Sequence, residues 1–281
     1  MSTFLVIGSI NYDMVLVVPE QPEAHTKVRA VGKTEMLGGA GANTAAWLAA
    51  LGDTVSLIGR IGADAHGSFC LQELQRLGVN CDGVIRDQTA PTSIAVCWSA
   101  GDDKRIVTYT GFASPLPYDL LRLDAAQSPI LHVATTETDS LVDALRFARG
   151  TGIRVSLELD GRSMARARDV ASLAFINSKE LRVVFGIDWT ALHPNDVRTL
   201  LPSPGAALVV TVGARCVRYV DHTEAITVPV APVETVDRTG GGDAFDAGFL
   251  HAWAAGADPQ SCLATGLEAA TRALLQLGAT P

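Results

Sequence analysis

The sequence contains no paired cysteine motif, no basic cluster and no uninterrupted apolar run of membrane-spanning length. Its five cysteines, at positions 70, 81, 97, 216 and 262, include no C-x-x-C pair, so they predict neither a disulfide framework nor a zinc site. A net charge of −8 without a lysine- or arginine-rich patch argues against a nucleic-acid partner. Charges or turn signals interrupt the apolar runs, which argues against a membrane protein. The chain opens on an apolar strand without a basic leader, and we expect a cytoplasmic protein.

Apolar segments of strand length alternate with helical segments along most of the chain. The sequence is 281 residues long and 48% apolar, which is ample for a large core. Strands are expected at residues 4–8, 55–59, 131–134, 155–159, 175–177 and 208–212, with helices between most of them. This alternation predicts an α/β fold in which helices cover both faces of a mostly parallel sheet. No repeat or linker divides the chain, so we expect one domain over residues 1–281.

Four shorter strands fall outside this alternation. They are expected at residues 15–18, 27–31, 93–98 and 105–110, and prolines or turn residues separate them within each pair. We interpret them as a separate small sheet drawn from about residues 14–33 and 92–111.

The segment 236–250, VDRTGGGDAFDAGFL, places three glycines and an acidic residue before an apolar helix. Gly240, Gly241 and Gly242 let the backbone approach an anion without interference from a Cβ atom. The start of the helix adds unpaired N–H donors and the positive end of the helix dipole. Asp243 is therefore a candidate general base that faces a bound phosphate. The alternative is a glycine-rich turn before a core helix, since aspartate is common in any first helical turn.

This segment resembles the C-terminal signature of the PfkB (ribokinase-like) family of sugar and nucleoside kinases, D-T-x-G-A-G-D-x-F. The resemblance implies a ribokinase-like fold and ATP-dependent phosphorylation of a hydroxyl, with Asp243 as base and Gly240 to Gly242 as an oxyanion-type hole. The segment departs from the family pattern at Arg238, where threonine is usual, and at Asp246, where asparagine is usual. A second carboxylate one turn from Asp243 could raise one pKa, and Arg238 could offset it or meet an anionic acceptor.

Two further polar motifs are candidates for acceptor binding. Asn11 and Asp13 follow the first strand, and a carboxylate can accept from two adjacent sugar hydroxyls. An Asx-type turn explains them equally well, but the resemblance, through G-x-x-N-x-D, implies that they hold the acceptor. Gly38, Gly39 and Asn43 match the family's G-G-x-x-x-N, before a helix expected at residues 45–51. The glycines would admit a small acceptor, and the asparagine can donate to and accept from its hydroxyls.

Two other nucleotide-binding motifs are broken in this sequence. A dinucleotide G-x-G-x-x-G fingerprint fails because Thr44 occupies the position of the third glycine, which disfavours a dehydrogenase. A P-loop fails because the residue five positions before Gly32 is Lys27 instead of glycine.

Two strand ends carry candidate nucleotide-binding residues. Asn177 and Glu180 match the family's N-x-x-E, in which the glutamate acts through water on the Mg²⁺ that neutralises nucleotide phosphates. One carboxylate is chemically enough, since Mg²⁺ keeps several waters. The alternative is a helix capping box. Thr211 and Gly213 resemble T-x-G-x-x-G, a nucleotide-phosphate loop, with Cys216 in place of the last glycine.

The resemblance also implies a monovalent-cation loop and a β-sheet lid. Asp237 and Thr239 resemble the start of a loop that often binds a potassium-like ion, and Asp160 with Arg162 resembles the family's D-x-x-x-R region. The small sheet matches the lid, which could exclude water from the reacting phosphate and often forms a homodimer contact. His66 is interpreted as part of the scaffold and not as a catalyst.

Together these features predict an ATP- and Mg²⁺-dependent kinase that phosphorylates a primary hydroxyl of a sugar or sugar derivative. The alternatives are a nucleoside kinase of the same family and a non-catalytic sugar-binding or regulatory member, which the departures from the family pattern keep open. A nucleobase usually requires aromatic stacking, and aromatic residues make up only 6% of the chain. Four aromatics lie in or near the expected lid: Tyr12, Trp98, Tyr109 and Phe112.

Overall fold

The central sheet contains nine strands within the described part of the chain. The computed structural model describes residues 1–101, 103–111, 130–135, 139–159 and 165–281. In spatial order the strands are β13 (Ala225–Pro229), β12 (Cys216–Val220), β11 (Ala207–Thr211), β10 (Leu173–Asn177), β9 (Arg154–Glu158), β8 (Ile130–Ala134), β1 (Thr3–Gly8), β4 (Thr54–Gly62) and β5 (Asn80–Asp87). Seven of these strands run parallel, whereas β12 and β13 extend one edge in antiparallel fashion. The prediction of a mostly parallel sheet is therefore confirmed.

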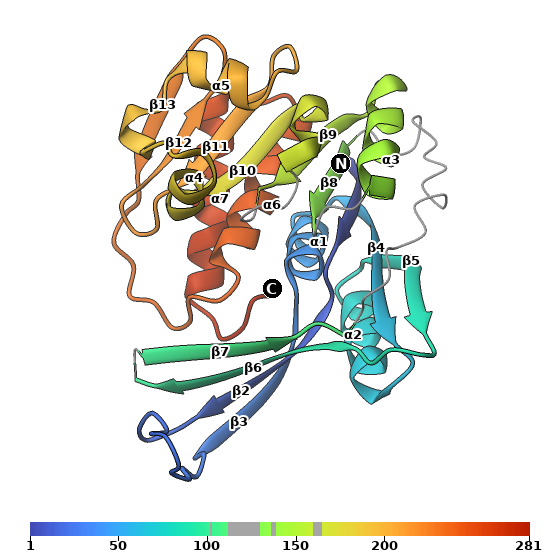
Figure 1. Cartoon of the computed structure of the whole chain (residues 1–281), viewed down its shortest axis with the longest axis vertical. Coiled ribbons are helices and arrows are strands. Elements are labelled where there is room, and N and C mark those ends of the chain that lie inside the picture. Colours follow the sequence, from blue (N-terminus) through green and yellow to red (C-terminus); the bar gives the residue numbers. More distant parts are fainter. Residues whose placement is uncertain (102, 112–129, 136–138, 160–164) are drawn as a thin grey trace.

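Helices cover both faces of this sheet (Figure 1). One face carries α1 (Ala40–Ala50), α2 (Ala65–Arg76), α6 (Gly241–Ala254) and α7 (Pro259–Leu274), and the other carries α3 (Asp139–Gly150), α4 (Ser178–Phe185) and α5 (Pro194–Leu200). The side chains of β1 pack alternately against the two helix layers, because successive residues of a strand point to opposite faces. Phe4 and Val6 pack on the first side and Leu5 and Ile7 on the second. None of the described helices is long and apolar enough to cross a bilayer.

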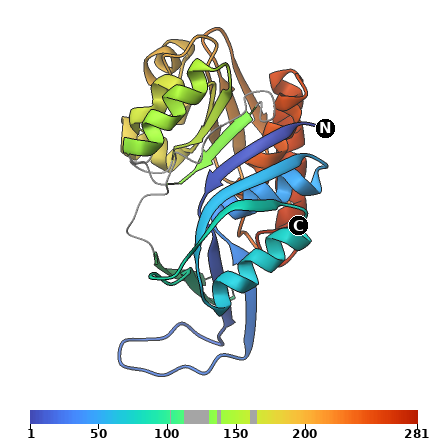
Figure 2. The same ribbon diagram turned by 90° about the vertical axis from the view of Figure 1, so that its right-hand side faces the viewer.

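A second, smaller sheet lies below the central sheet in Figure 1. Its strands are β3 (Gly32–Gly38), β2 (Asn11–Val17), β6 (Ser93–Ala100) and β7 (Asp103–Tyr109), in that spatial order. The prediction of a strand at residues 27–31 was wrong, because β2 pairs with β3 only from Gly32 onward and leaves that segment without a partner strand. Figure 2 shows the connection between β2 and β3 projecting from the molecule.

The small sheet is joined to helix α2 by an aromatic contact. The ring of Tyr12 on β2 stacks on the ring of His66, with centroids 4.2 Å apart, and meets the edge of Phe69. Tyr12 is buried. His66 therefore packs within the scaffold, as the sequence predicts.

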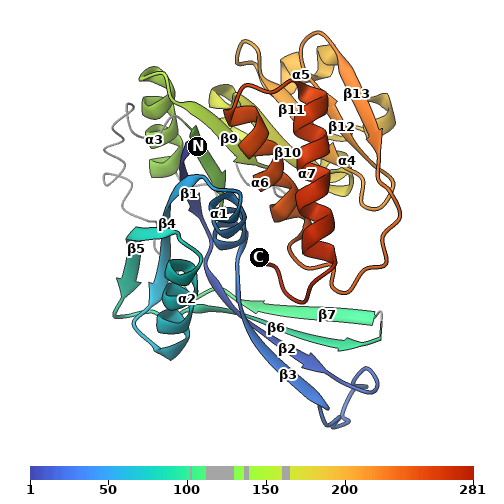
Figure 3. The same ribbon diagram turned by 180° about the vertical axis from the view of Figure 1, so that it is seen from behind.

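The C-terminal segment packs against α1 and the start of α6, and Figure 3 places the end of the chain near the small sheet. The indole N–H of Trp47 on α1 donates a buried hydrogen bond of 2.9 Å to the carbonyl of Ala279. Ala279 also packs against Gly240, at the first residue before α6. The segments around these three residues, far apart in sequence, thus meet at the same point.

Candidate active site

Helix α6 begins with backbone N–H groups that no side chain of the described residues caps. Its N-cap, Gly240, has a φ of +73°, and a Cβ atom there would lie 2.5 Å from the Cβ of Ala279. Only glycine combines that conformation with so close an approach. The first helical hydrogen bond runs from Ala244 to Gly240, so the N–H groups of Gly241, Gly242 and Asp243 have no acceptor within the helix. This helix end is therefore suited to an anion.

Asp243 accepts a hydrogen bond of 2.6 Å from the side-chain amide of Asn43. Helix α1 begins at Ala40, earlier than predicted, so Asn43 lies in its first turn. Two glycines allow α1 to lie directly on β1: a Cβ atom on Gly41 would be 2.4 Å from the Cα of Gly8. This close packing brings the first turn of α1 to the first turn of α6.

Asp13 lies on β2 opposite the end of β3 and has an unused acceptor atom. A Cβ atom on Gly38 would lie 2.2 Å from the carboxyl carbon of Asp13, so Gly38 provides the space that the carboxylate occupies. Asp13 Oδ1 is buried without a hydrogen-bond partner among the described residues, and so is Asn43 Oδ1. Buried polar atoms normally have partners. The two oxygens therefore indicate a polar ligand that brings its own donors.

The two acidic residues of this group have raised pKa values. Burial raises the pKa of Asp243 to about 6; the hydrogen bond from Asn43 lowers it and the charge of Asp13 raises it further. Burial also raises the pKa of Asp13 to about 6, while the nearby Lys104 opposes that shift. Both effects follow from removing water from the charged form.

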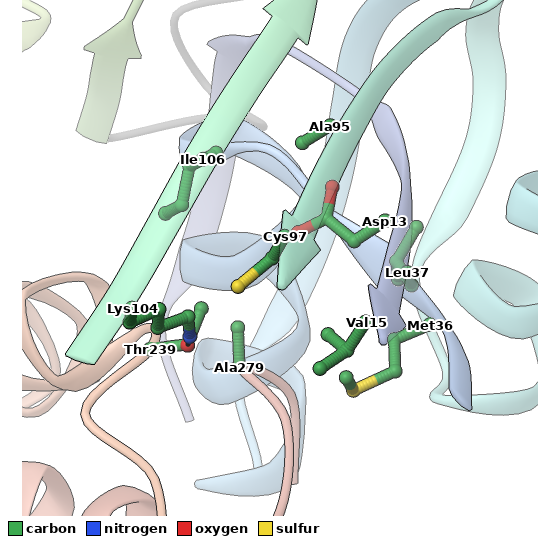
Figure 4. Close-up of a pocket in the computed structure, with 10 residues that line it drawn as sticks. All are labelled: Asp13, Val15, Met36, Leu37, Ala95, Cys97, Lys104, Ile106, Thr239 and Ala279. Atoms are coloured by element: carbon green, nitrogen blue, oxygen red, sulfur yellow. Dashed lines mark hydrogen bonds between the residues drawn. The ribbon is translucent and has the colours of Figure 1, made fainter. Parts of the chain in front are cut away.

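A small pocket that is partly open to solvent lies between the small sheet and the loop before α6. Ten of the described residues line it, from all four strands of the small sheet, this loop and the C-terminal segment (Figure 4). Asp13, Lys104 and Thr239 contribute a carboxylate, an ammonium and a hydroxyl to an otherwise largely apolar lining. No aromatic side chain is among the ten.

Lys104 is the site residue that the sequence reasoning missed. It lies on β7, and its Nζ contacts Thr239 Oγ1 and lies 3.2 Å from Asp237 Oδ1. The strand was expected from residue 105, whereas β7 begins at Asp103. An earlier start would have placed residues 104 and 106 on one face, since alternate residues of a strand share a face.

The nucleotide candidates form a second group at the ends of two parallel strands. Asn177 ends β10, Thr211 ends β11, and the two residues are paired in register. Gly213 follows in the turn before β12, with a φ of +58°. Strands β1, β8, β9, β10 and β11 run parallel, so their carboxyl ends lie on the same side of the sheet. The nucleotide candidates and the residues that follow β1 therefore lie on that side.

Glu180 and Asn177 form the capping box that was the alternative interpretation. The side-chain oxygen of Asn177 accepts from the N–H groups of Lys179 and Glu180, and a carboxylate oxygen of Glu180 accepts from the N–H of Asn177 at 3.4 Å. The capping box is therefore present in the structure, and the assignment of Glu180 to Mg²⁺ stays a prediction.

Comparison with known proteins identifies the family. The family profile described as "pfkB family carbohydrate kinase" matches residues 1–281. This chain belongs to the pfkB family. It is 27% identical over 285 residues to ribokinase of Bacillus subtilis strain 168, which covers 99% of this chain and 95% of that protein. It is 28% identical over 269 residues to a nucleoside kinase of Methanothermobacter thermautotrophicus. That alignment covers 92% of this chain and 84% of the relative.

The solved structures support the same fold. Arabidopsis thaliana ribokinase, complexed with ribose and ATP, is similar with a TM-score of 0.85 at 24% identity, covering 99% of this chain and 95% of that one. The predicted ribokinase-like fold, a mostly parallel sheet with helices and a separate small sheet, is thereby confirmed.

One departure of this pfkB-family chain from the family pattern has no effect on the local backbone. Cys216 begins β12, and its carbonyl accepts from the N–H of Val212 at 2.9 Å. Among the described residues, only His25 combines a positive φ with a side chain. Glycine is therefore not required at position 216. The other residues of interest from the sequence, Phe112, Asp160 and Arg162, lie outside the described part of the chain.

The other two departures lie in different environments. Arg238 is exposed. Asp246 is buried on α6, and burial raises its pKa well above the ordinary value, with Glu158 and Asp243 adding to the shift through their charges. Arg238 is not among the groups that shift this pKa, which burial, Glu158 and Asp243 all raise.

Proposed function

We propose that this chain is an ATP-dependent phosphotransferase that phosphorylates a primary hydroxyl of a sugar or sugar derivative. The observation that carries the proposal is the position of Asp243, in the first turn of α6, beside uncapped N–H groups and hydrogen-bonded to Asn43. Membership of a carbohydrate kinase family supports it, as do relatives named ribokinase and nucleoside kinase.

Asp243 is assigned the role of general base. The acceptor oxygen attacks the γ-phosphorus of ATP, the new O–P bond forms, the bond to the ADP oxygen breaks, and the hydroxyl proton passes to Asp243. A carboxylate with a pKa of about 6 is a stronger base than free aspartate and is still ionised at neutral pH. The N–H groups of Gly241 and Gly242 would stabilise charge on the transferring group, and Gly240 supplies the turn that aims them.

The acceptor hydroxyls are assigned to Asp13 and Asn43, whose Oδ1 atoms are buried and lack protein donors among the described residues. Asn11 is two residues from Asp13 on the same strand and is assigned to the same ligand. Gly38 and Gly39 leave room for it. No aromatic side chain is among the described residues that line the pocket, which favours a sugar over a nucleoside, because a nucleobase gains from stacking.

The nucleotide is assigned to the second group of residues. Asn177, Thr211 and Gly213 lie at the sheet edge, where α/β proteins bind ligands. Glu180 fits Mg²⁺, which prefers oxygen ligands and keeps several waters. When bound with ATP, Mg²⁺ would neutralise phosphate charge. A potassium ion at Asp237 does not fit, because Lys104 already contacts that carboxylate.

We further propose that the small sheet acts as a lid and as a homodimer contact in the cytoplasm. Val107 and Tyr109 lie on the same face of β7, opposite to the face that carries Lys104 and Ile106, and each is 57% exposed. Exposed apolar clusters mark interaction surfaces. Light scattering of wild type and Val107→Asp would test the contact: the variant is expected to have half the wild-type mass.

The function is tested by incubating the purified chain with Mg-ATP and a panel of sugars, sugar phosphates and nucleosides, with ADP release as the readout. Acceptor-dependent ADP release with a sugar, abolished in Asp243→Asn, is the expected result. Release with nucleosides alone would favour the nucleoside kinase alternative. Sugar binding by calorimetry without ADP release would favour the non-catalytic one.

A further inference from the structure

Lys104 places a positive charge on the loop where a potassium-like ion was expected. Its Nζ lies 3.2 Å from Asp237 Oδ1 and contacts Thr239 Oγ1, although Asp237 is 133 residues away in sequence. The Lys104 side chain is 28% exposed and that of Asp237 9%, so water screens this pair less than it screens a surface ion pair. In Figure 4 the Lys104 and Thr239 side chains meet at the edge of the pocket.

The carboxylate of Asp237 is surrounded by donors. Oδ1 accepts from the backbone N–H of Thr239 at 3.0 Å and from its hydroxyl at 2.7 Å, and Oδ2 accepts from the N–H of Gly278 at 3.2 Å. Asp237 therefore organises both the loop before α6 and the C-terminal segment. A carboxylate this enclosed needs a nearby positive charge. Lys104 supplies it from a different part of the fold.

A monovalent cation that used the same oxygens would compete with this ammonium. Potassium and a lysine ammonium carry the same charge and both take oxygen partners, so either can balance Asp237. Both cannot lie at these two oxygens, because like charges at contact distance repel strongly. The residues expected to hold potassium thus already have an occupant that belongs to the chain.

We propose that Lys104 is a built-in replacement for the monovalent cation: it holds the loop at residues 237–239, and through it the start of α6, so that the chain needs no potassium. Lys104 is a positioning residue in this account. Only the effect of Lys104 on the reaction rate depends on the proposed kinase function; its role in holding the loop does not. Because Lys104 belongs to the small sheet, the same contact also joins that sheet to the loop before α6.

The kinetic test uses wild type, Lys104→Met and the control Lys33→Met. Lys33 lies on the same small sheet, is 54% exposed and, within the described part of the chain, forms an ion pair with the exposed Glu35 alone, so its loss removes the same charge from outside the site. ADP release is measured in potassium chloride and in tetramethylammonium chloride at equal ionic strength. Wild type and Lys33→Met are expected to be insensitive to the change of cation. Lys104→Met is expected to lose about 10- to 100-fold in kcat, a range typical of groups that orient a site's ligands, and to regain much of it in potassium.

A second readout does not depend on catalysis. A cation that binds the folded state raises its melting temperature by mass action, so Lys104→Met is expected to melt higher in potassium than in tetramethylammonium, while the two other proteins are not. Activation or stabilisation of wild type by potassium would overturn the proposal, and this result does not require the variant to fold. A Lys104→Met protein with raised KM for ATP or acceptor and no potassium response would also overturn it, by making Lys104 a substrate contact. Failure of the kinase function itself would appear as missing ADP release, with the melting data still decisive.

Discussion

Asn43 and Asp243 are 200 residues apart in sequence and are joined by a hydrogen bond of 2.6 Å between the first turns of two helices. The donor is an amide and the acceptor is the carboxylate that we assign as the general base. The bond therefore fixes both the position of the base and the oxygen that remains available to the acceptor. It also stabilises the ionised form of Asp243 and thereby lowers its pKa.

Replacing Asn43 by alanine is expected to slow the reaction and to change its pH dependence. Loss of a hydrogen bond that lowers the pKa of Asp243 raises that pKa, so the acid limb of the kcat/KM profile moves to higher pH. We expect kcat at neutral pH to fall by about 10- to 100-fold, which is less than the loss of the base itself would cost, because Asp243 is retained. A pH–rate profile between pH 5 and 9 measures both effects. The matched control is Asn80→Ala, at an exposed position on β5; an unshifted limb in Asn43→Ala would contradict the assignment.

Gly38→Ala is expected to weaken acceptor binding while leaving ATP binding intact. The new Cβ would lie 2.2 Å from the carboxyl carbon of Asp13, so the carboxylate must move out of the position in which its free oxygen accepts from a hydroxyl. We expect a rise of about tenfold or more in the KM for the acceptor, since one hydrogen bond to a charged group contributes about 1.5–3 kcal/mol. Gly150→Ala, where the Cβ meets nothing within 4 Å, is the control. Equal acceptor KM values in the two variants would exclude Asp13 from the acceptor site.

The sequence allowed the fold and most members of the site to be predicted, but not their contacts. Asp243, Asn43 and Asp13 were each identified from short motifs, because a polar residue within five positions of a glycine leaves a local signal. Lys104 left none, since its partners lie 133 and 135 residues away. The strand expected at residues 27–31 was wrong for a related reason: strand pairing depends on where the partner strand ends, which local alternation does not encode.

Asp246→Asn is expected to stabilise the protein at neutral and alkaline pH. Burial and two nearby carboxylates raise the pKa of Asp246 in the folded state, so the folded protein holds a proton that the unfolded chain releases above about pH 4. The stability associated with the protonated carboxyl is full below that pH and is lost as the pH rises towards the folded-state pKa. Asparagine does not titrate and avoids this loss.

The measurement for Asp246 is urea denaturation of both proteins at pH 4, 6 and 8. The difference in unfolding free energy is expected to grow from pH 4 to pH 8 in favour of the variant, at about 1.4 kcal/mol for each unit by which the pKa is raised. A difference that stays constant across these pH values would show that Asp246 is ionised in the folded state.

The turnover number of Asp243→Asn tests the central claim most directly. The substitution keeps the size of the side chain and removes its ability to take a proton. We expect kcat to fall by about 10²- to 10⁴-fold, while calorimetry shows ATP and acceptor affinities within a few-fold of wild type. Turnover close to that of wild type, with folding and binding intact, would contradict the assignment of Asp243 as the base.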